Sequence, residues 1–232
     1  MLRFEACEID NDGFRLSADF EIAAGRIVGV IGPSGGGKTT LLEAVAGFLP
    51  LAAGEIFWHG TPLSGLEPGK RPVAMLFQDG NLFPHLSVAQ NVGLGIAPSL
   101  RLSAQDRGRV AAALARVGLE GLGERRPAAL SGGQRARVAL ARLMVQARDI
   151  FLLDEPFAAL GPALKAEMLA LVAEIARERG ATVLLVSHDP EDARQMAGEV
   201  VLVAGGRASA PVATKRLFAD PPAALRDYLG EG

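Results

Sequence analysis

The fold is decided by the stretch Gly32-Pro33-Ser34-Gly35-Gly36-Gly37-Lys38-Thr39-Thr40, whose first eight residues match the phosphate-binding pattern GxxxxGK[ST]. An apolar run, 27–31, precedes it, and a run typical of a helix extends from Lys38 to about Gly47. Between a strand and a helix, glycines let backbone N–H groups surround an anion, and the helix start adds partial positive charge. The sequence therefore predicts a site for nucleotide phosphates.

Two residues of this stretch carry the chemistry of phosphoryl transfer. We expect Lys38 to reach the β- and γ-phosphates of ATP and the Thr39 hydroxyl to ligate Mg²⁺. The rest of the stretch would hold the nucleotide through the loop and the first helical turn: Gly32, Pro33, Ser34, Gly35, Gly36, Gly37 and Thr40. A match by accident is disfavoured, because the pattern lies in the strand–loop–helix context that it requires.

A second apolar run, Ile150–Leu153, ends in the carboxylates Asp154 and Glu155. In proteins with this phosphate loop such a strand is expected beside the strand that precedes the loop, which would place Asp154 near Mg²⁺. Glu155 follows directly and could orient or deprotonate an attacking water. Without the phosphate loop, a pair of solvated charges at a strand end would explain them equally well.

The sequence Leu130-Ser131-Gly132-Gly133-Gln134 opens a predicted helix over 131–147. Ser131 suits the N-cap, but two glycines weaken a helix and need another reason. Close approach of the backbone to a second anion is one. Two anion-binding helix starts and one nucleotide motif suggest a dimer, in which each Ser131–Gln134 segment covers the phosphate loop of the other copy.

The remaining pattern predicts an α/β fold, with a P-loop core built on a RecA-like parallel sheet. The alternation over Phe14–Ile22 and the piece Glu55–Trp58 indicate an antiparallel β subdomain. An α-helical subdomain, 84–148, would be inserted between core segments 1–83 and 149–232. Further expected elements are strands at 73–77, 182–187 and 200–204, the last of them the final strand, and helices at 103–117, 162–179 and 190–196.

Composition narrows the class of protein. Of 232 residues, 49% are hydrophobic and 22% charged, and the formal net charge is −2, which disfavours both disorder and nucleic acid as the main partner. A single cysteine, Cys7, allows no internal disulfide. The apolar runs fall short of the ~20 residues of a membrane span, and the N-terminus lacks the apolar core of a signal peptide. We expect any work at a membrane to depend on docking to other proteins.

The motifs above, with a lone His188, have the order and spacing of an ABC transporter nucleotide-binding domain, which the chain resembles over almost its whole length. The segment Leu130–Gln134 is close to diagnostic of that family. The resemblance implies ATP hydrolysis with ATP and Mg²⁺, a homodimer, and transmembrane permease subunits. It further implies an indirect link to an extracytoplasmic solute-binding protein and a peripheral location on the cytoplasmic face of the inner membrane.

The resemblance also assigns two further site residues. Gln78, after the strand 73–77, would touch Mg²⁺ or its water, and His188, after the strand 182–187, would contact the γ-phosphate. The stretch 71–95 resembles the thiamine-import ATPases within the family. Import of another small solute (an oxyanion, iron or a polyamine) stays open, and action on nucleic acid is the alternative from another class.

Two positions depart from the family pattern, and one segment is a candidate for binding a partner protein. Gly161 stands where an aspartate is usual, which puts communication between the two sites of a dimer in doubt. Asn11 stands where an adenine-stacking aromatic is usual; the nearest aromatic, Phe14, alternates with buried positions and favours core packing. The segment 78–86, with Leu82, Phe83 and Leu86, is a candidate docking surface for the permease, or else a hinge that packs its own apolar residues.

Overall fold

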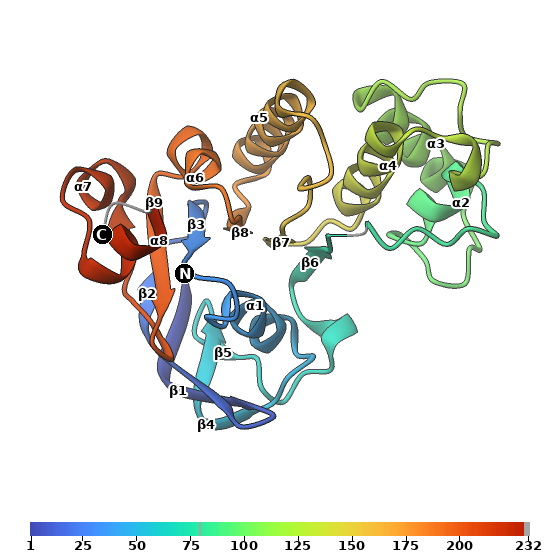
Figure 1. The fold of residues 1–232 in the computed structure, drawn as a ribbon. Coiled ribbons are helices and arrows are strands. Elements are labelled where there is room, and N and C mark those ends of the chain that lie inside the picture. The colour runs from blue at the N-terminus through green and yellow to red at the C-terminus, as the bar shows by residue number, and fades with distance from the viewer. Residues whose placement is uncertain (79, 230–232) are drawn as a thin grey trace.

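The computed structural model describes residues 1–78 and 80–229, which form one large sheet flanked by helices (Figure 1). Its parallel part has the order β9-β3-β8-β7-β6. These strands are β3 (Ile27–Ile31), β6 (Val73–Leu76), β7 (Ile150–Asp154), β8 (Thr182–Val186) and β9 (Glu199–Ala204). Their continuous apolar character follows from burial on both faces.

The antiparallel part adjoins β9 through the short strand β10 (Arg207–Ala208). It contains β1 (Leu2–Asn11), β2 (Phe14–Ile22), β4 (Leu51–Trp58) and β5 (Thr61–Pro62). Along β2 the side chains of Leu16, Phe20 and Ile22 are buried while Arg15 and Glu21 are exposed. The predicted alternation is therefore confirmed, and the strand faces the core on one side only.

Helices cover both faces of the parallel strands (Figure 1). Leu41 and Leu42 of α1 (Lys38–Ala46) pack with Ile150 and Leu152 of β7. The intervening residues of that strand pack on the opposite face with α5 (Pro162–Arg179). The ends of α5 match the sequence prediction: Pro162 occupies the first turn and Gly180 ends the helix with φ 62°.

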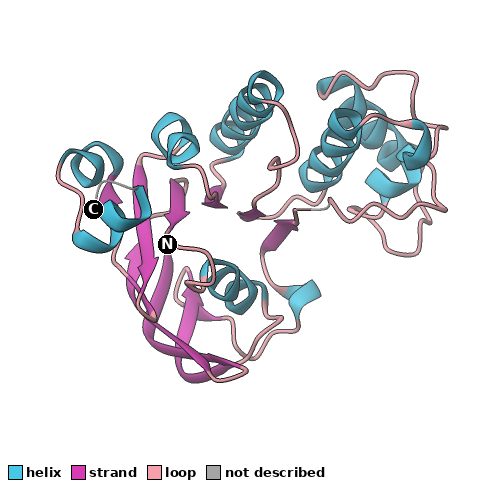
Figure 2. Cartoon of the chain, viewed as in Figure 1, coloured by secondary structure: helices cyan, strands magenta, loops and turns pink. Residues whose placement is uncertain are grey.

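A group of three helices lies at one end of the molecule (Figure 2). It comprises α2 (Val88–Gly93), α3 (Ala104–Arg116) and α4 (Gly132–Val145). Each begins at a serine N-cap whose hydroxyl accepts the backbone N–H three residues on: Ser87, Ser103 and Ser131. The predicted helices 103–117 and 131–147 are present, with ends shifted by one or two residues.

One predicted neighbour relation is wrong. The strand before the phosphate loop, β3, does not pair with β7, because β8 lies between them and pairs with both. The helix α5 returns the chain from β7 to the position next to β3. Asp154 still reaches the loop, because α1 starts at the end of β3 and packs across the sheet against β7.

The prediction of 200–204 as the final strand is also wrong. After β9 come β10, β11 (Val212–Ala213), α7 (Thr214–Ala219) and α8 (Ala223–Leu229). Leu217 and Leu225 of these helices are buried against Ile31, at the end of β3, and against Ala193 of α6 (Pro190–Met196). The chain therefore returns to the carboxyl end of β3, where the phosphate loop begins.

Among residues 1–78 and 80–229, no helix combines the length and the apolar character that crossing a bilayer would need. Two single 3-10 turns, Pro68–Lys70 and Pro127–Ala129, complete the described elements.

Candidate nucleotide site

The phosphate loop has the backbone conformation that its glycines permit. Gly32, Gly35 and Gly37 have φ values of 147°, 73° and 100°, which side-chain-bearing residues rarely adopt. A Cβ atom on Gly32 would lie 2.0 Å from the carbonyl oxygen of Val203. The loop runs directly into α1, whose start has neither a side-chain cap nor an acidic residue. Its first N–H groups are thus available for an anion.

Lys38 folds back over this loop. Its Nζ atom donates hydrogen bonds of 2.9 Å to the carbonyl oxygens of both Gly32 and Pro33. The residue is buried, and burial lowers the pKa of Lys38, a shift that the carboxylates of Glu155 and Asp154 oppose. A cation is therefore held at the mouth of the loop, where it can meet the phosphates of a nucleotide.

Thr39 and Asp154 meet beside the loop. The Thr39 hydroxyl donates to Oδ1 of Asp154 at 3.2 Å, although 115 positions separate the two residues. Burial raises the pKa of Asp154, and the hydrogen bond from Thr39 opposes that shift. One hydroxyl and one carboxylate fit the way proteins hold Mg²⁺, which keeps several waters and completes its ligands with substrate phosphates. The described residues contain no cluster of three or more His, Cys, Asp or Glu side chains able to hold a metal without a nucleotide.

Glu155 and His188 form a pair next to Lys38. Glu155 has φ 45°, an uncommon conformation for a residue with a side chain, and its N–H donates to the carbonyl of Val186 on β8 at 3.1 Å. Its Oε2 atom lies 3.0 Å from Nδ1 of His188. The turn after β7 thus aims a carboxylate at an imidazole that follows the neighbouring strand, an arrangement suited to moving a proton or orienting water.

The residues beside His188 are held by an ion network that the sequence analysis missed. Lys165 of α5 contacts Oδ2 of Asp189 at 3.1 Å and Oδ2 of Asp192 at 2.7 Å. The Ser187 hydroxyl donates to Asp192 and accepts the N–H of Asp189. Lys165 lies within α5 and belongs to no recognisable motif, so the sequence carried no signal for these contacts.

The segment Ser131–Gln134 lies at the start of α4, in the group of three helices. The Ser131 hydroxyl accepts from the N–H of Gln134 at 3.2 Å, and Oε1 of Gln134 accepts from the N–H of Ser131 at 3.0 Å. This reciprocal cap occupies the side chain of Gln134. A Cβ atom on Gly133 would lie 2.5 Å from Leu164 of α5, so this glycine also serves packing within the chain.

Gln78 is exposed two residues after the end of β6 and lines a groove of about 180 Å³ together with Gly132 and Pro156. The sequence-predicted site residues therefore form two sets. The loop residues, Asp154, Glu155 and His188 converge within one chain. Ser131, Gly132 and Gly133 lie at the start of α4, where Gly132 lines the same groove as Gln78.

The two departures have clear structural settings. Gly161 is the N-cap of α5 with φ −64°, and a Cβ atom there would meet nothing within 4 Å. Phe14 is partly buried against the core, as the alternation predicted. Its ring also borders the phosphate loop, because a Cβ atom on Gly37 would lie 2.8 Å from its Cε1 atom.

The fold and these motifs define a P-loop ATPase. A family model described as "ABC transporter" matches residues 16–158, and this chain belongs to the ABC transporter family, as its ATP-binding subunit. The expected α/β fold of the ABC ATPases is confirmed.

Curated relatives and solved structures agree with this placement. The chain is 63% identical to the thiamine import ATP-binding protein ThiQ of Cereibacter sphaeroides and 61% identical to that of a Ruegeria species. Each match covers 99% of this chain and 100% of the relative. The structure of cbiO1 from Clostridium perfringens, part of the transporter complex cbiONQ, superposes with a TM-score of 0.84 at 30% identity, covering 94% of this chain and 90% of that one. A dimeric post-hydrolysis structure of the ATP-binding cassette MJ0796, bound to ADP and Pi, gives 0.80 at 26%, covering 92% and 99%.

Proposed function

We propose that this chain drives a thiamine importer, by hydrolysing ATP in a dimer that is docked on membrane permease subunits. The assignment of thiamine as the solute rests on two relatives at 63% and 61% identity. Both are thiamine import ATP-binding proteins, and both are matched over their full length. No residue described above recognises thiamine, since an ATPase subunit acts on nucleotide.

The convergence at the loop supports specific roles for the site residues. Lys38 and the loop N–H groups would bind the β- and γ-phosphates, with Gly32 to Gly37 and Thr40 shaping the cradle. Thr39 and Asp154 would hold Mg²⁺, and Gln78 would reach the same ion or its water. When bound, Mg²⁺ would neutralise charge on the phosphates. Glu155 would orient the attacking water, and His188, held by Glu155, would contact the γ-phosphate.

A homodimer would complete each site. Within one chain, the start of α4 presents the Ser131 hydroxyl and backbone N–H groups, and its first turn has no acidic residue. Gly132 lines a groove together with Gln78. A helix start of this kind favours an anion. Placing Ser131, Gly132 and Gly133 of one copy over the γ-phosphate held by the other would supply that anion. The dimeric relative bound to ADP and Pi supports such an assembly.

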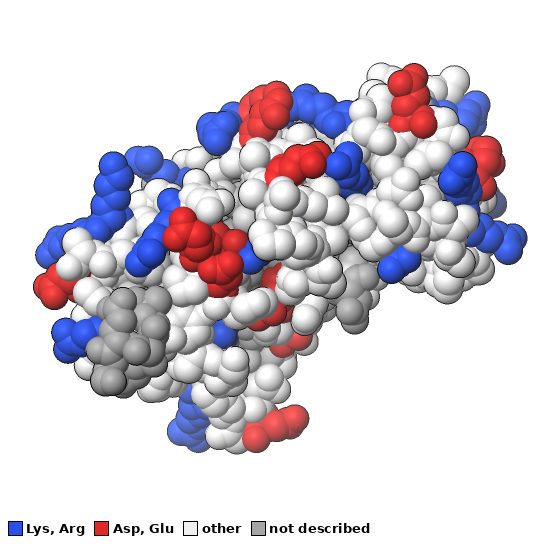
Figure 3. Space-filling view, turned by 45° about the horizontal axis from the view of Figure 1, so that its top comes forward, with Lys and Arg blue, Asp and Glu red and all other residues white. Residues whose placement is uncertain are grey.

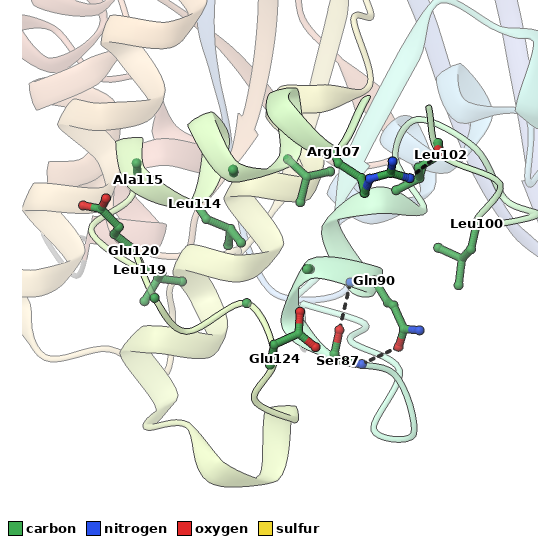
Figure 4. Close-up of a pocket in the computed structure, with 15 residues that line it drawn as sticks. Ser87, Gln90, Leu100, Leu102, Arg107, Leu114, Ala115, Leu119, Glu120 and Glu124 are labelled. Carbon is green, nitrogen blue, oxygen red and sulfur yellow. Dashed lines mark hydrogen bonds between the residues drawn. The ribbon is translucent and has the colours of Figure 1, made fainter. Parts of the chain in front are cut away.

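The permease would dock on the surface formed by 80–86 and an adjoining groove in the helical group (Figure 4). This groove of about 610 Å³ is lined by leucines, among them Leu102, Leu114 and Leu119, with Glu120 and Glu124 at its rim. In the segment 80–86, Phe83 leaves 46% of its surface exposed. An apolar floor with a charged rim suits an apolar segment of a partner protein.

The segment 80–86 is hydrogen-bonded to two helices of the helical group, α2 and α4. The fully buried Asn91 side chain of α2 exchanges hydrogen bonds with the backbone of Phe83, and Arg142 of α4 donates to the carbonyl oxygens of Gly80 and Asn81, each at 2.7 Å. We therefore assign 84–148 to a helical subdomain between core segments 1–83 and 149–232, with 80–83 as the connection that is hydrogen-bonded to it. Asp79, within the segment 78–86 suggested by the sequence, lies outside the described residues.

Action on nucleic acid is the less favoured alternative. Basic and acidic side chains are intermixed on the face shown in Figure 3, and the net charge is −2. A continuous basic field would be expected for a protein that binds a phosphate backbone.

Uptake of radiolabelled thiamine by cells lacking this chain tests the proposal. We expect uptake to fail and to return with the wild-type chain but not with Glu155→Gln expressed at the same level. Normal thiamine uptake in cells that lack this chain and have no second copy of its gene would overturn the assignment of thiamine as the solute. If thiamine uptake were normal while that of an oxyanion, iron or a polyamine failed, another importer would be assigned.

A further inference from the structure

The last two helices of the described chain pack against the catalytic end of the sheet. Leu217 of α7 and Leu225 of α8 are buried together with Ile31, the residue before the phosphate loop, and with Ala193, five positions after His188. This placement brings the C-terminal helices next to the segment that carries His188. In Figure 1, α7 and α8 lie beside β9 and α6.

Tyr228 on α8 makes a direct contact with that segment. Its hydroxyl donates a hydrogen bond to the main-chain carbonyl oxygen of His188, and the two residues are 40 positions apart. The ring is partly buried against the cluster formed by Leu217 and Leu225. A partly buried tyrosine usually pairs its hydroxyl in this way, but here the partner is the backbone of a proposed site residue.

The contact supplies a constraint that the neighbouring interactions do not. Ser187, Asp189 and Lys165 hold the residues on either side of His188 through side chains and one N–H group. The Tyr228 contact instead fixes the peptide carbonyl of His188 itself. Because that peptide sets the direction of the imidazole, it bears on the 3.0 Å approach of Nδ1 to Glu155.

We propose that Tyr228 is a positioning residue for ATP hydrolysis, which holds the backbone of His188 so that the imidazole meets Glu155 and the γ-phosphate. The inference rests on the proposed role of His188. It makes the C-terminal helix part of the hydrolytic machinery, although Tyr228 itself touches no nucleotide.

The surroundings of the hydroxyl keep it a donor. Burial raises the pKa of Tyr228, and the negative charges of Asp189, Glu155 and Asp192 raise it further. The phenol therefore stays protonated at neutral pH and can donate to the carbonyl throughout the range in which the enzyme is assayed.

Steady-state ATPase kinetics of the full-length chain test the proposal. Tyr228→Phe keeps the ring and removes the hydroxyl. We expect kcat to fall about 3- to 10-fold, the effect of one lost hydrogen bond on a placed group, with KM for ATP unchanged. Phe218→Leu is the matched control: Phe218 belongs to the same C-terminal cluster and lies under the Arg194 guanidinium at 4.3 Å, so this variant should lower stability but not kcat.

A double-mutant cycle separates this inference from the role of His188. If His188→Ala keeps full activity, the proposed role of His188 fails. If His188→Ala is impaired while Tyr228→Phe matches wild type, the positioning role of Tyr228 fails alone. When both single variants are slow, the proposal requires Tyr228→Phe to cause no further loss in the His188→Ala background. A loss of the same size in both backgrounds would overturn it.

A spectroscopic readout follows from Tyr228 being the only tyrosine in the chain. With ¹³C placed at Cζ of tyrosine, the protein gives one ring-carbon resonance for this hydroxyl. We expect this resonance to shift in His188→Gly, in which the unrestrained peptide changes the acceptor, and to stay unmoved in Lys215→Ala on the exposed part of α7. An unchanged resonance in His188→Gly would contradict the contact.

Discussion

The phosphate loop with the start of α1 and the start of α4 are both helix starts that favour an anion, yet different side chains surround them. Around the loop, Lys38 donates to the loop backbone, Asp154 accepts from the Thr39 hydroxyl, and Glu155 pairs with His188. At the start of α4, the Ser131 and Gln134 side chains each accept a hydrogen bond from the backbone N–H of the other residue, and the first turn has no acidic residue. One region can perform chemistry and the other can only recognise charge, so each lacks what the other provides.

The largest effect should come from removing the cation of the loop. We expect Lys38→Ala to lower ATPase activity at least ~10²-fold, because transition-state charge on the phosphates loses its nearest protein counter-ion. A phosphate-release assay measures this, with Lys215→Ala, an exposed lysine on α7, as the matched control. Activity within a few-fold of wild type would show that the loop side does not carry the chemistry.

A comparable loss of hydrolysis, with a different effect on assembly, is expected for Glu155→Gln. The amide keeps the shape but cannot act as a base, so hydrolysis should fall ~10²- to 10³-fold while ATP still binds. The γ-phosphate would then persist between the loop and the start of α4. Size-exclusion chromatography with saturating ATP should show a stable dimer, and a protein that stays monomeric would contradict the division of labour between the two regions.

A smaller effect is expected at Gly161, which tests how the two sites of a dimer communicate. A side chain meets no obstacle there, so Gly161→Asp introduces the carboxylate without a clash. We expect the Hill coefficient for ATP to rise from about 1 towards 2. Gly161→Asn gives the same helix cap without charge and should leave it unchanged. An unaltered Hill coefficient in both variants would show that an aspartate at position 161 does not couple the two ATP sites of the dimer.

The smallest effect concerns stability. Because burial raises the pKa of Asp154 above its unfolded value, the folded state prefers the protonated acid, and ionisation of this residue costs stability as pH rises through the folded pKa. Asp154→Asn should therefore raise the free energy of unfolding slightly at pH 7 without nucleotide, with no gain below the unfolded pKa of about 3.9. Urea unfolding at the two pH values measures this. If Asp154→Asn were less stable than wild type at pH 7, burial of the ionised Asp154 carboxylate would not cost stability. ATPase activity should be lost in this variant in either case.

Much of the fold could be predicted from the sequence because its signals are local. The apolar run 27–31, the glycines after it, and Pro162 with Gly180 each determine a strand, a loop or a helix through their own backbone preferences. Strand order is a property of the whole sheet, and the placement of β8 between β3 and β7 could not be obtained from either strand alone.

The site shows the same limit. Lys38, Thr39 and Asp154 belong to motifs with a recognisable pattern. Lys165 lies 23 residues before His188 and Tyr228 lies 40 residues after it, yet both contact the His188 segment. A lysine in a helix and a tyrosine near the end of the chain have no pattern that predicts such contacts.

Cross-linking between two differently tagged copies tests most directly whether the loop of one chain meets the α4 start of another. Ser34→Cys and Ser131→Cys each place a thiol on an exposed residue, and the native Cys7 is buried with its pKa raised to about 11, so it should not react with maleimides at neutral pH. In the Glu155→Gln background with ATP, a short bismaleimide should join the Ser34→Cys copy to the Ser131→Cys copy, while neither variant alone forms a product of that size. Absence of the mixed product at saturating ATP, when both copies are shown to bind nucleotide, would contradict a site shared between two chains.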